Sequence, residues 1–288
     1  MNFRLRVIMI KVSDYMTPIV AVVSPYDTLA TVRNVMLGKR VGRVPVIDDG
    51  RLVGIVSRTD LALALKPGGP PWRRRPLEYT NVWEVMSKPV LTITPNESIS
   101  NAAEIMLDNG VTGLPVVDEG EVVGMISTSD LTRCLMEHGN PSKKVKECMC
   151  KEVAVVKPLY TINHVIKLLV ETPSHRVVVV DAEGRPIGII TPTDLAFVRV
   201  APPKKKSIVY DDGAPQPTRR IRYLAITYAK DIMKSPLHYI SEEASIVDAA
   251  SLMRSAKIGG LPVLDKRKNL AGLFSKLEVM KLVKDLEA

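Results

Sequence analysis

The stretch GIVSRTD, from Gly54 to Asp60, decides the fold because close copies of it return three more times along the chain. The copies are GMISTSD, GIITPTD and GLFSKLE, which begin at Gly124, Gly188 and Gly272. They stand about 65 to 85 residues apart, a period that indicates a repeated structural unit. We therefore expect one small unit that is used four times.

The same landmarks precede each copy in the same order. A short segment with a methionine opens the unit, an amphipathic stretch follows, and a β-branched run then ends in an acid before a polar turn and the Gly-led phrase. The four openings contain Met16, Met86, Met149 and Met233. The four acids are Asp48, Asp118, Asp181 and Asp265. This shared order predicts that the four units are homologous.

The first unit shows the local structure that the pattern predicts. Leu29, Val32 and Met36 recur at helical spacing. Residues 44–47 and 52–56 are expected to form two short strands around a tight polar turn, and a second helix begins at the closing phrase. The order is strand, helix, strand, strand, helix, of the α/β (α+β) class. Since about 50 to 55 residues bury little surface alone, we expect the units to associate in two pairs.

These repeats resemble CBS domains, the modules named after cystathionine β-synthase. The matching parts are the Met-bearing opening, the Leu-Pro-Val-Val-Asp type of strand, and the closing Gly-hydrophobic-hydrophobic-Ser/Thr-x-x-Asp phrase. Repeats one to four are expected at residues 12–65, 82–135, 145–198 and 229–283, with an N-terminal segment at 1–11 and basic connectors at 66–81 and 199–228. The resemblance implies two tandem modules that form a flat pseudo-symmetric disk. It also implies one cleft per repeat for an adenosyl ligand: AMP, ADP, ATP or S-adenosylmethionine.

The acids of the closing phrases are the expected ribose ligands. Asp60, Asp130 and Asp194 are each predicted at a helix start, where a carboxylate can accept both ribose hydroxyl protons and free N–H groups favour a phosphate. The hydroxyls near ribose or phosphate belong to Ser57, Thr59, Ser127, Ser129, Thr191 and Thr193. The resemblance implies adenine contacts with backbone groups after the openings, at Ile19, Val20, Val90, Leu91, Val153 and Ala154.

The same pattern has a purely structural interpretation. A Ser-x-x-Asp or Ser-x-x-Glu sequence before an apolar run is also a capping box that completes a helix start, and one residue can serve both purposes. The fourth repeat departs from the others because Glu278 replaces the aspartate. Its longer side chain should misplace the carboxylate against a ribose, so we expect that cleft to be weak or empty.

Three basic residues are candidates for phosphate binding. Arg43 precedes the β-branched strand of repeat one, and His175 with Arg176 precedes that of repeat three. The His-Arg pair resembles the one that contacts phosphates in the γ subunit of AMP-activated protein kinase, and the planar fork of arginine suits phosphate oxygens. The alternative is a solvated charge at a strand start. Repeats two and four have Gly113 and Gly260 at this place, so phosphate charge is distributed unequally.

The two connectors contain most of the net charge. Residues 66–81 have four basic side chains against one acidic, and residues 199–228 have seven against two, in a chain of formal charge +9. Both are rich in proline or glycine, and Trp72 and Tyr223 lie beside arginines. One interpretation is docking on an acidic partner or nucleic acid, with the aromatic rings stacked on bases. The other is a solvated linker.

Composition and missing motifs limit the function. The 288 residues contain no apolar stretch of about 20, and the N-terminus is short and basic, so we expect a cytoplasmic protein without a cleavable signal. Three cysteines suit reduced thiols, with no metal site expected. No phosphate loop or dinucleotide fingerprint is found. We predict a stand-alone regulatory module, not an enzyme, that signals energy or metabolite state to a partner, as a monomer or homodimer and without an obligatory cofactor. The alternatives are a nucleic-acid-binding scaffold and a structural module with empty clefts.

Overall fold

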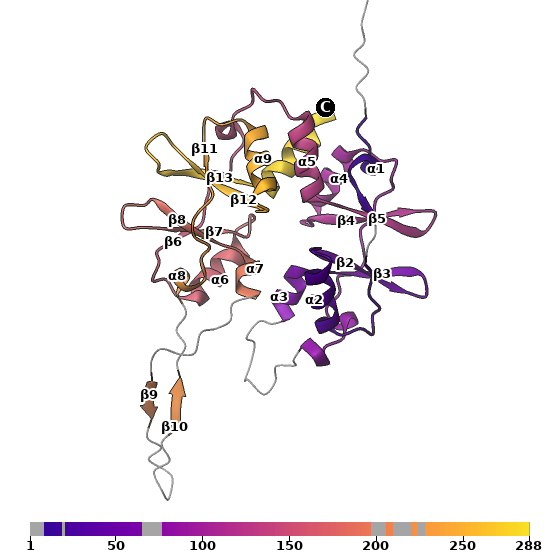
Figure 1. Cartoon of the computed structure of the whole chain (residues 1–288), viewed down its shortest axis with the longest axis horizontal. Helices are drawn as coiled ribbons and strands as arrows, with labels where there is room; N and C mark the ends of the chain where they lie inside the picture. The colour runs from indigo at the N-terminus through magenta and orange to yellow at the C-terminus, as the bar shows by residue number, and fades with distance from the viewer. Residues whose placement is uncertain are drawn as a thin grey trace, which may run out of the picture. The chain divides into compact units, whose positions relative to one another are not determined.

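The structure, a computed structural model, describes residues 9–18, 21–64, 77–196, 206–209, 220–223 and 228–287 (Figure 1). The chain divides into two compact units. The first comprises Met1–Glu152 and His238–Ala288, and it contains repeats one and two, most of repeat four and the opening of repeat three. The second comprises Val153–Leu237 and contains most of repeat three.

Each repeat contains a helix, an antiparallel hairpin and a second helix, in the predicted order. Repeats one and two contain α2 (Leu29–Gly38), β2 (Arg43–Asp48), β3 (Arg51–Ser57), α3 (Arg58–Ala64), α4 (Ile99–Asp108), β4 (Gly113–Asp118), β5 (Glu121–Ser127) and α5 (Thr128–His138). Repeat three contains β6 (Val155–Val156), α6 (Ile162–Glu171), β7 (Val177–Val180), β8 (Pro186–Ile190) and α7 (Pro192–Ala196). Repeat four contains β11 (Ile240–Ser241), α9 (Ile246–Ser255), β12 (Gly260–Leu264), β13 (Leu270–Ser275) and α10 (Lys276–Lys284).

The first strand of each repeat is shorter than its hairpin strands. In repeats three and four it forms β6 and β11, which pair in parallel with β7 and β12. In repeats one and two it is reduced to single parallel bridges, from Val23 to Val46 and from Ile93 to Val116. Short helical turns open the repeats: α1 (Val12–Tyr15), η3 (Val82–Glu84), η4 (Val145–Glu147) and α8 (Ala229–Ile232). Two further turns are η2 (Leu77–Tyr79) and η5 (Asp285–Glu287).

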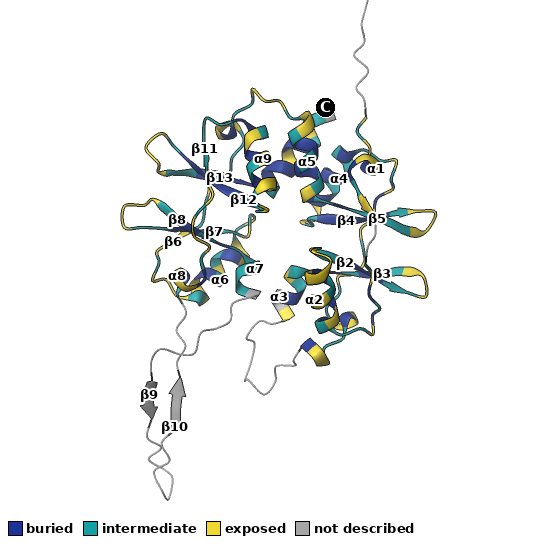
Figure 2. Cartoon of the chain, in the orientation of Figure 1, coloured by how far each residue is buried: buried dark blue, intermediate teal, exposed yellow. Residues whose placement is uncertain are grey.

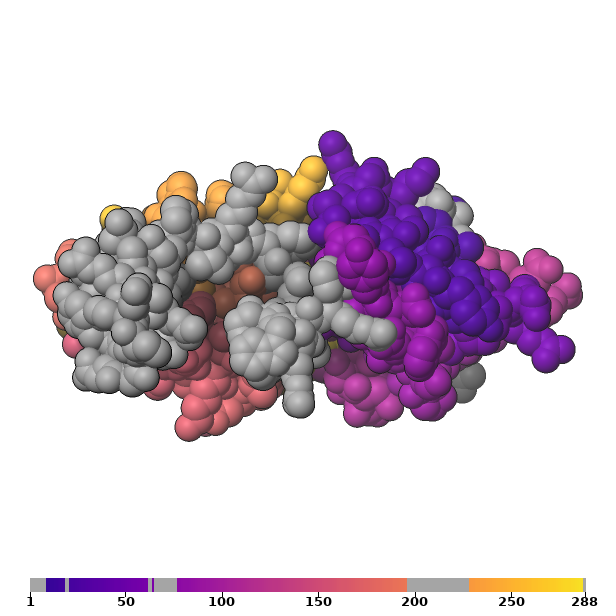
Figure 3. Space-filling view, turned by 90° about the horizontal axis from the view of Figure 1, so that it is seen from below, coloured from indigo at the N-terminus to yellow at the C-terminus, as the bar shows by residue number. Residues whose placement is uncertain are grey.

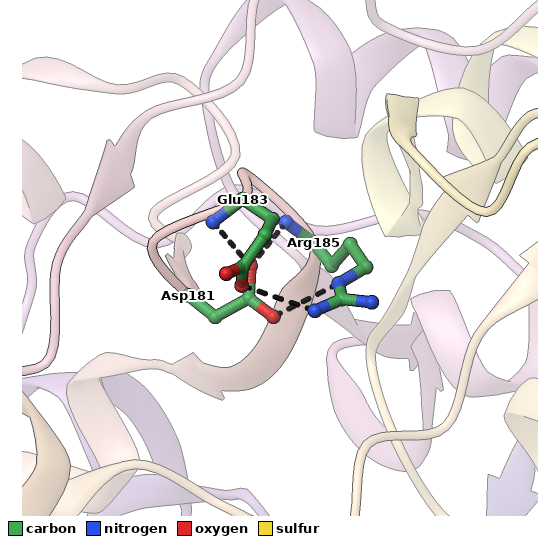
Figure 4. Close-up of polar contacts among 3 residues, drawn as sticks. All are labelled: Asp181, Glu183 and Arg185. Carbon is green, nitrogen blue, oxygen red and sulfur yellow. Dashed lines mark hydrogen bonds and ion pairs between the residues drawn. The ribbon is translucent and has the colours of Figure 1, made fainter.

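Turn chemistry explains the acid that follows the second strand in repeats three and four. Asp181 Oδ1 accepts hydrogen bonds from the backbone N–H groups of Glu183 and Arg185, at 3.1 and 2.8 Å, and Oδ2 pairs with Arg185 Nε at 3.0 Å (Figure 4). Desolvation alone would raise the pKa of Asp181, but the hydrogen bonds from Arg185 lower it below the ordinary value. Asp265 closes the turn of repeat four with similar bonds to backbone N–H groups. These acids therefore shape the hairpin turns.

The methionine of each opening covers the glycine that begins the closing phrase of another repeat. β1 (Thr17–Pro18) pairs with β5, and Met16 Sδ lies 2.9 Å from the place that a Cβ on Gly124 would occupy. The other three pairs are Met86 with Gly54, Met149 with Gly272 and Met233 with Gly188. A side chain at these positions would displace the methionine. The openings are therefore exchanged between repeats one and two, and between repeats three and four.

Repeats two and four share one hydrophobic core inside the first unit. Helix α5 packs against α9, and α10 packs against α4 and α5, with their buried faces turned toward one another (Figures 1 and 2). Repeat one has a separate core around Leu29, Val44 and Val56, and its atoms lie against those of repeat two (Figure 3). Repeat three has its own core around Val165 and Val177.

The insertion at residues 199–228 contains structure that the sequence did not predict. β9 (Lys206–Val209) and β10 (Arg220–Tyr223) form a two-stranded antiparallel ribbon where only a loop was expected. Residues 65–76 lie outside the described residues, as do the side chains of the ribbon. The proposed stacking of Trp72 and Tyr223 on bases stays a prediction for that reason. Within the described residues, no helix is both long and apolar enough to cross a membrane.

Candidate functional site

The acids of the closing phrases each cap their own helix with one carboxylate oxygen. The backbone N–H and the hydroxyl of Ser57 both donate to Asp60 Oδ2, each at 2.7 Å. Ser127 donates to Asp130 Oδ2 at 2.9 and 2.7 Å. Thr191 donates to Oδ2 of the third aspartate at 2.8 and 2.6 Å. The capping box is thus present in all three repeats, and it fixes the orientation of each carboxylate.

Capping leaves the second oxygen available in repeats one and two. Oδ1 of Asp60 and of Asp130 forms no hydrogen bond or ion pair with any described residue, and both residues are half-buried. Burial raises the pKa of Asp130, and the hydrogen bonds from Ser127 only partly oppose that rise. Each acid is therefore held rigidly with one acceptor oxygen still to be used.

In repeat three a lysine occupies the second oxygen. Lys234 Nζ lies 2.9 Å from Asp194 Oδ1, and the Asp194 side chain is 7% exposed whereas that of Lys234 is 61% exposed. The lysine follows the opening methionine of repeat four, and its backbone N–H donates to Ile189 O at 3.0 Å. Sequence reasoning missed this residue. The available signal was that it is the charged member of the four residues that follow the opening methionines, the others being Thr17, Ser87 and Cys150.

The fourth repeat uses its glutamate in the same way but in a different setting. The backbone N–H and hydroxyl of Ser275 donate to Glu278 Oε2 at 2.8 and 2.7 Å. Glu278 is only 1% exposed, since α10 belongs to the core that repeats two and four share. That its cleft is weak or empty stays a prediction.

Arg43 stands between the closing phrases of repeats one and two. It begins β2 directly opposite Ser57, just as Gly113 lies opposite Ser127. Its Nη1 lies 3.2 Å from the place that a Cβ on Gly113 would occupy, so the glycine makes room for the guanidinium. Burial lowers the pKa of Arg43 to about 10, and the attraction of Asp60 opposes part of that effect. Arg43 forms no hydrogen bond or ion pair with any described residue, so its half-buried guanidinium has no direct partner among them.

The other two phosphate candidates lie at the start of β7. Arg176 Nη1 donates to Ser174 O at 2.7 Å, and the residue is half-buried. His175 has a positive φ of 47° and lies 2.9 Å from Leu169 O through Nδ1. Because a carbonyl oxygen only accepts, Nδ1 donates there and Nε2 stays available for another partner.

The remaining predicted residues are arranged less specifically. Ile19 and Val20 lie outside the described residues. Among the other adenine candidates Leu91 is exposed, and the half-buried ones are Val90, Val153 and Ala154. Among the hydroxyl candidates Thr59 and Ser129 are exposed, whereas Thr193 is half-buried. The contacts of the described residues do not test whether these positions bind a ligand, so their roles stay predictions.

A polar network that the sequence did not indicate fastens α1 to α5. The Tyr15 hydroxyl donates to Glu137 and lies 3.0 Å from His138 Nε2. Arg133 Nη2 donates to Tyr15 O at 2.6 Å, and the guanidinium stacks over the tyrosine ring at 5.0 Å. Burial together with the bond to Glu137 raises the pKa of Tyr15 well above its ordinary value. Among the described residues, no group of three or more His, Cys, Asp or Glu is placed to hold a metal ion.

Comparison with known proteins identifies the repeats. The family model of the CBS domain matches residues 12–67, 82–137, 145–200 and 229–285. The chain belongs to the CBS domain family. Both the predicted family and the predicted α/β repeat fold are thereby confirmed. Among listed relatives by sequence, the CBS domain-containing protein YhcV of Bacillus subtilis is 34% identical over 123 residues, 43% of this chain and 84% of YhcV.

Two proteins of known structure are similar over nearly the whole chain. The uncharacterized protein MJ1225 of Methanocaldococcus jannaschii is 27% identical over 276 residues, 91% of this chain and 94% of MJ1225. The crystal structure of MJ1225, described as a proposed archaeal homologue of g-AMPK, matches with a TM-score of 0.76 at 24% identity and covers 94% of this chain and 99% of that one. A conserved protein from Pyrococcus horikoshii matches with a TM-score of 0.64 at 20% identity, over 95% of this chain and its own full length. These likenesses show that the fold of nearly the whole chain recurs in other proteins.

Proposed function

We propose that this CBS protein is a regulatory module that binds adenosyl ligands, namely AMP, ADP, ATP or S-adenosylmethionine, at the closing phrases of repeats one, two and three. It has no reaction of its own and reports the occupancy of these sites to a partner protein. The observation that supports the proposal is the spare carboxylate oxygen of Asp60 and of Asp130. A ribose presents two adjacent hydroxyl donors, and an oriented acceptor oxygen is what they require.

Arg43 supports a ligand with a phosphate group. A half-buried guanidinium without a hydrogen-bonding partner is unfavourable in the ligand-free protein, because it has lost water and the attraction of Asp60 compensates only part of that loss. A phosphate oxygen pair satisfies its planar fork in a bidentate manner. The position of Arg43 beside Gly113 puts that charge within the pair of repeats one and two.

The exchanged openings supply a route from ligand to partner. The adenine is expected beside an opening, at Val90 and Leu91 for example, whereas the ribose is expected at a closing phrase. Met86 of that opening covers Gly54 of the paired repeat. A ligand that touches both segments therefore ties two repeats together and favours the conformation in which they are closely paired. Signalling requires only that the ligand binds this conformation better than the alternative.

Calorimetric titration with AMP, ADP, ATP and S-adenosylmethionine tests the proposal. The variants Asp60→Asn, Asp130→Asn and Asp194→Asn keep an oxygen for capping but remove the carboxylate, and each should abolish one site. Asp248→Asn is the matched control, since Ser245 and Asp248 form the same capping box on α9, away from any closing phrase. It should leave the number of sites unchanged. Absence of binding by the unmodified chain, or unchanged binding in all three site variants, contradicts the proposal.

A further inference from the structure

Two variable positions lie next to each closing phrase. One is the residue opposite the Ser of the phrase in repeats one, two and four, and in repeat three it is Arg176, which directly precedes the paired residues Val177 and Ile190. The other is the residue after the opening methionine of the paired repeat, which bridges to the phrase itself. In the order of repeats one to four, these pairs are Arg43 with Ser87, Gly113 with Thr17, Arg176 with Lys234, and Gly260 with Cys150. Repeat three thus has a cation at both positions, repeat one has a single cation, and repeats two and four have none.

Lys234 is fixed at its place by the backbone. Its N–H donates to Ile189 O at 3.0 Å and its carbonyl accepts from Ile189 N–H at 3.4 Å, while the preceding Met233 covers Gly188. The side chain then extends so that Nζ lies 2.9 Å from Asp194 Oδ1. Because most of the lysine side chain is exposed, the amine can move away without any change in the core of repeat three.

The ion pair decides which ligands can reach the carboxylate. A ribose that binds Asp194 has to displace Lys234 first. An uncharged nucleoside leaves the ammonium group without its partner, and a cationic ligand such as a sulfonium adds repulsion. A phosphorylated ligand instead supplies new oxygens to the displaced lysine, beside Arg176 and His175 at the start of β7.

We propose that Lys234 makes repeat three selective for adenosyl ligands that bear phosphate groups, by exchanging Asp194 for a ligand phosphate when the nucleotide binds. This inference rests on the proposed function and names the ligand class for one site. Repeat two, whose equivalent residues are Gly113 and Thr17, has no lysine on its aspartate and therefore lacks this exchange.

The experiment isolates repeat three by using the full chain with Asp60→Asn and Asp130→Asn. ATP, AMP and adenosine are titrated calorimetrically into this chain and into the same chain with Lys234→Ser, which is the residue that repeat one has in this place. A charge-assisted hydrogen bond corresponds to roughly a tenfold to hundredfold change in affinity. Lys234→Ser should weaken ATP binding by about that factor and leave the affinity for adenosine equal or higher. The preference for ATP over adenosine should therefore fall. Lys234→Arg should retain the preference.

The control is Lys230→Ser, which removes an exposed lysine from α8 in the same segment and leaves Asp194 paired. It should not change the preference, which separates a local effect from one of net charge. Circular dichroism and thermal unfolding verify that each variant is folded. An unchanged preference in a folded Lys234→Ser chain that still binds ATP overturns the inference, as does loss of all binding when repeats one and two are disabled. Absence of binding by the unmodified chain overturns the proposed function instead.

Discussion

Arg43 brings a positive charge into a half-buried position where it has no hydrogen bond or ion pair with any described residue, so replacing it should stabilise the ligand-free protein. Arg43→Met is the suitable change. The methionine keeps much of the length and the aliphatic contact of the arginine with Gly113, but it removes the charge. Most substitutions destabilise a protein, so a gain in stability is a demanding prediction.

The magnitude follows from the pKa. Burial lowers the pKa of Arg43 by roughly two units from its ordinary value, to about 10, with the opposing attraction of Asp60 already included. Each pKa unit corresponds to about 1.36 kcal/mol, so about 3 kcal/mol is the upper bound of the penalty. The lowered pKa means that the folded state disfavours the proton, and the full penalty applies at every pH below about 10. Partial solvent screening reduces the expected gain at pH 7 to about 1–3 kcal/mol.

Urea unfolding at pH 7 measures this gain, and thermal unfolding should show a rise of roughly 2–4 °C per kcal/mol for a protein of this size. Arg254→Met is the control, because Arg254 is exposed at the end of α9 and its removal should give no gain. With saturating AMP the unmodified chain should become more stable than Arg43→Met, since it gains binding energy at Arg43 that the variant lacks. A less stable ligand-free Arg43→Met variant with unchanged AMP affinity refutes the reasoning.

Two further predictions concern the contacts between repeats one and two. Tyr15→Phe removes the hydroxyl that donates to Glu137, and it should lower the free energy of unfolding by about 1–3 kcal/mol in urea titrations; an unchanged midpoint contradicts this. Because the pKa of Tyr15 is raised in the folded state, the unfolded chain loses its proton first as the pH passes about 10, so stability should fall above that pH in the unmodified chain and less so in Tyr15→Phe. Gly124→Val places a side chain against Met16 and should destabilise the protein by about 1–3 kcal/mol, measured in the same way; a neutral effect shows that the methionine can move aside freely.

Structural features that depend only on neighbouring residues are predicted best from the sequence. The hairpin turn at Asp49 and Gly50, where both residues adopt positive φ, follows from a polar Asp-Asp-Gly segment between β-branched runs. The capping boxes follow from a Ser or Thr three residues before an acid. The four-fold recurrence then extends these local predictions to the whole chain. The position of Arg43 opposite Ser57 could not be predicted in this way, because a bulge between Val46 and Ile47 shifts the register that the turn alone would set.

Contacts between distant segments could not be predicted in the same way. The pair of Lys234 with Asp194 depends on which opening covers which closing phrase, and nothing in the local pattern states that exchange. The same holds for Arg133 and Tyr15, which lie 118 residues apart in the chain. The burial of Glu278 reflects the core that joins repeats two and four, which is also a long-range feature. A charged residue looks the same in the sequence whether it is solvated or binds a ligand. Only its neighbours in the structure distinguish the two cases.

Capping and ligand binding need not compete for the same acid. A carboxylate has two oxygens, and in every closing phrase the helix start uses one of them in a fixed orientation. The fold thereby holds the acid in place whether or not a ligand is present. The second oxygen is preorganised, so ligand binding costs no further conformational entropy of this side chain. What differs among the repeats is the partner of that second oxygen: no described residue for Asp60 and Asp130, and an exposed lysine for Asp194. A repeated fold can in this way keep one binding frame while two neighbouring positions, such as Arg176 and Lys234, set the charge that each site accepts.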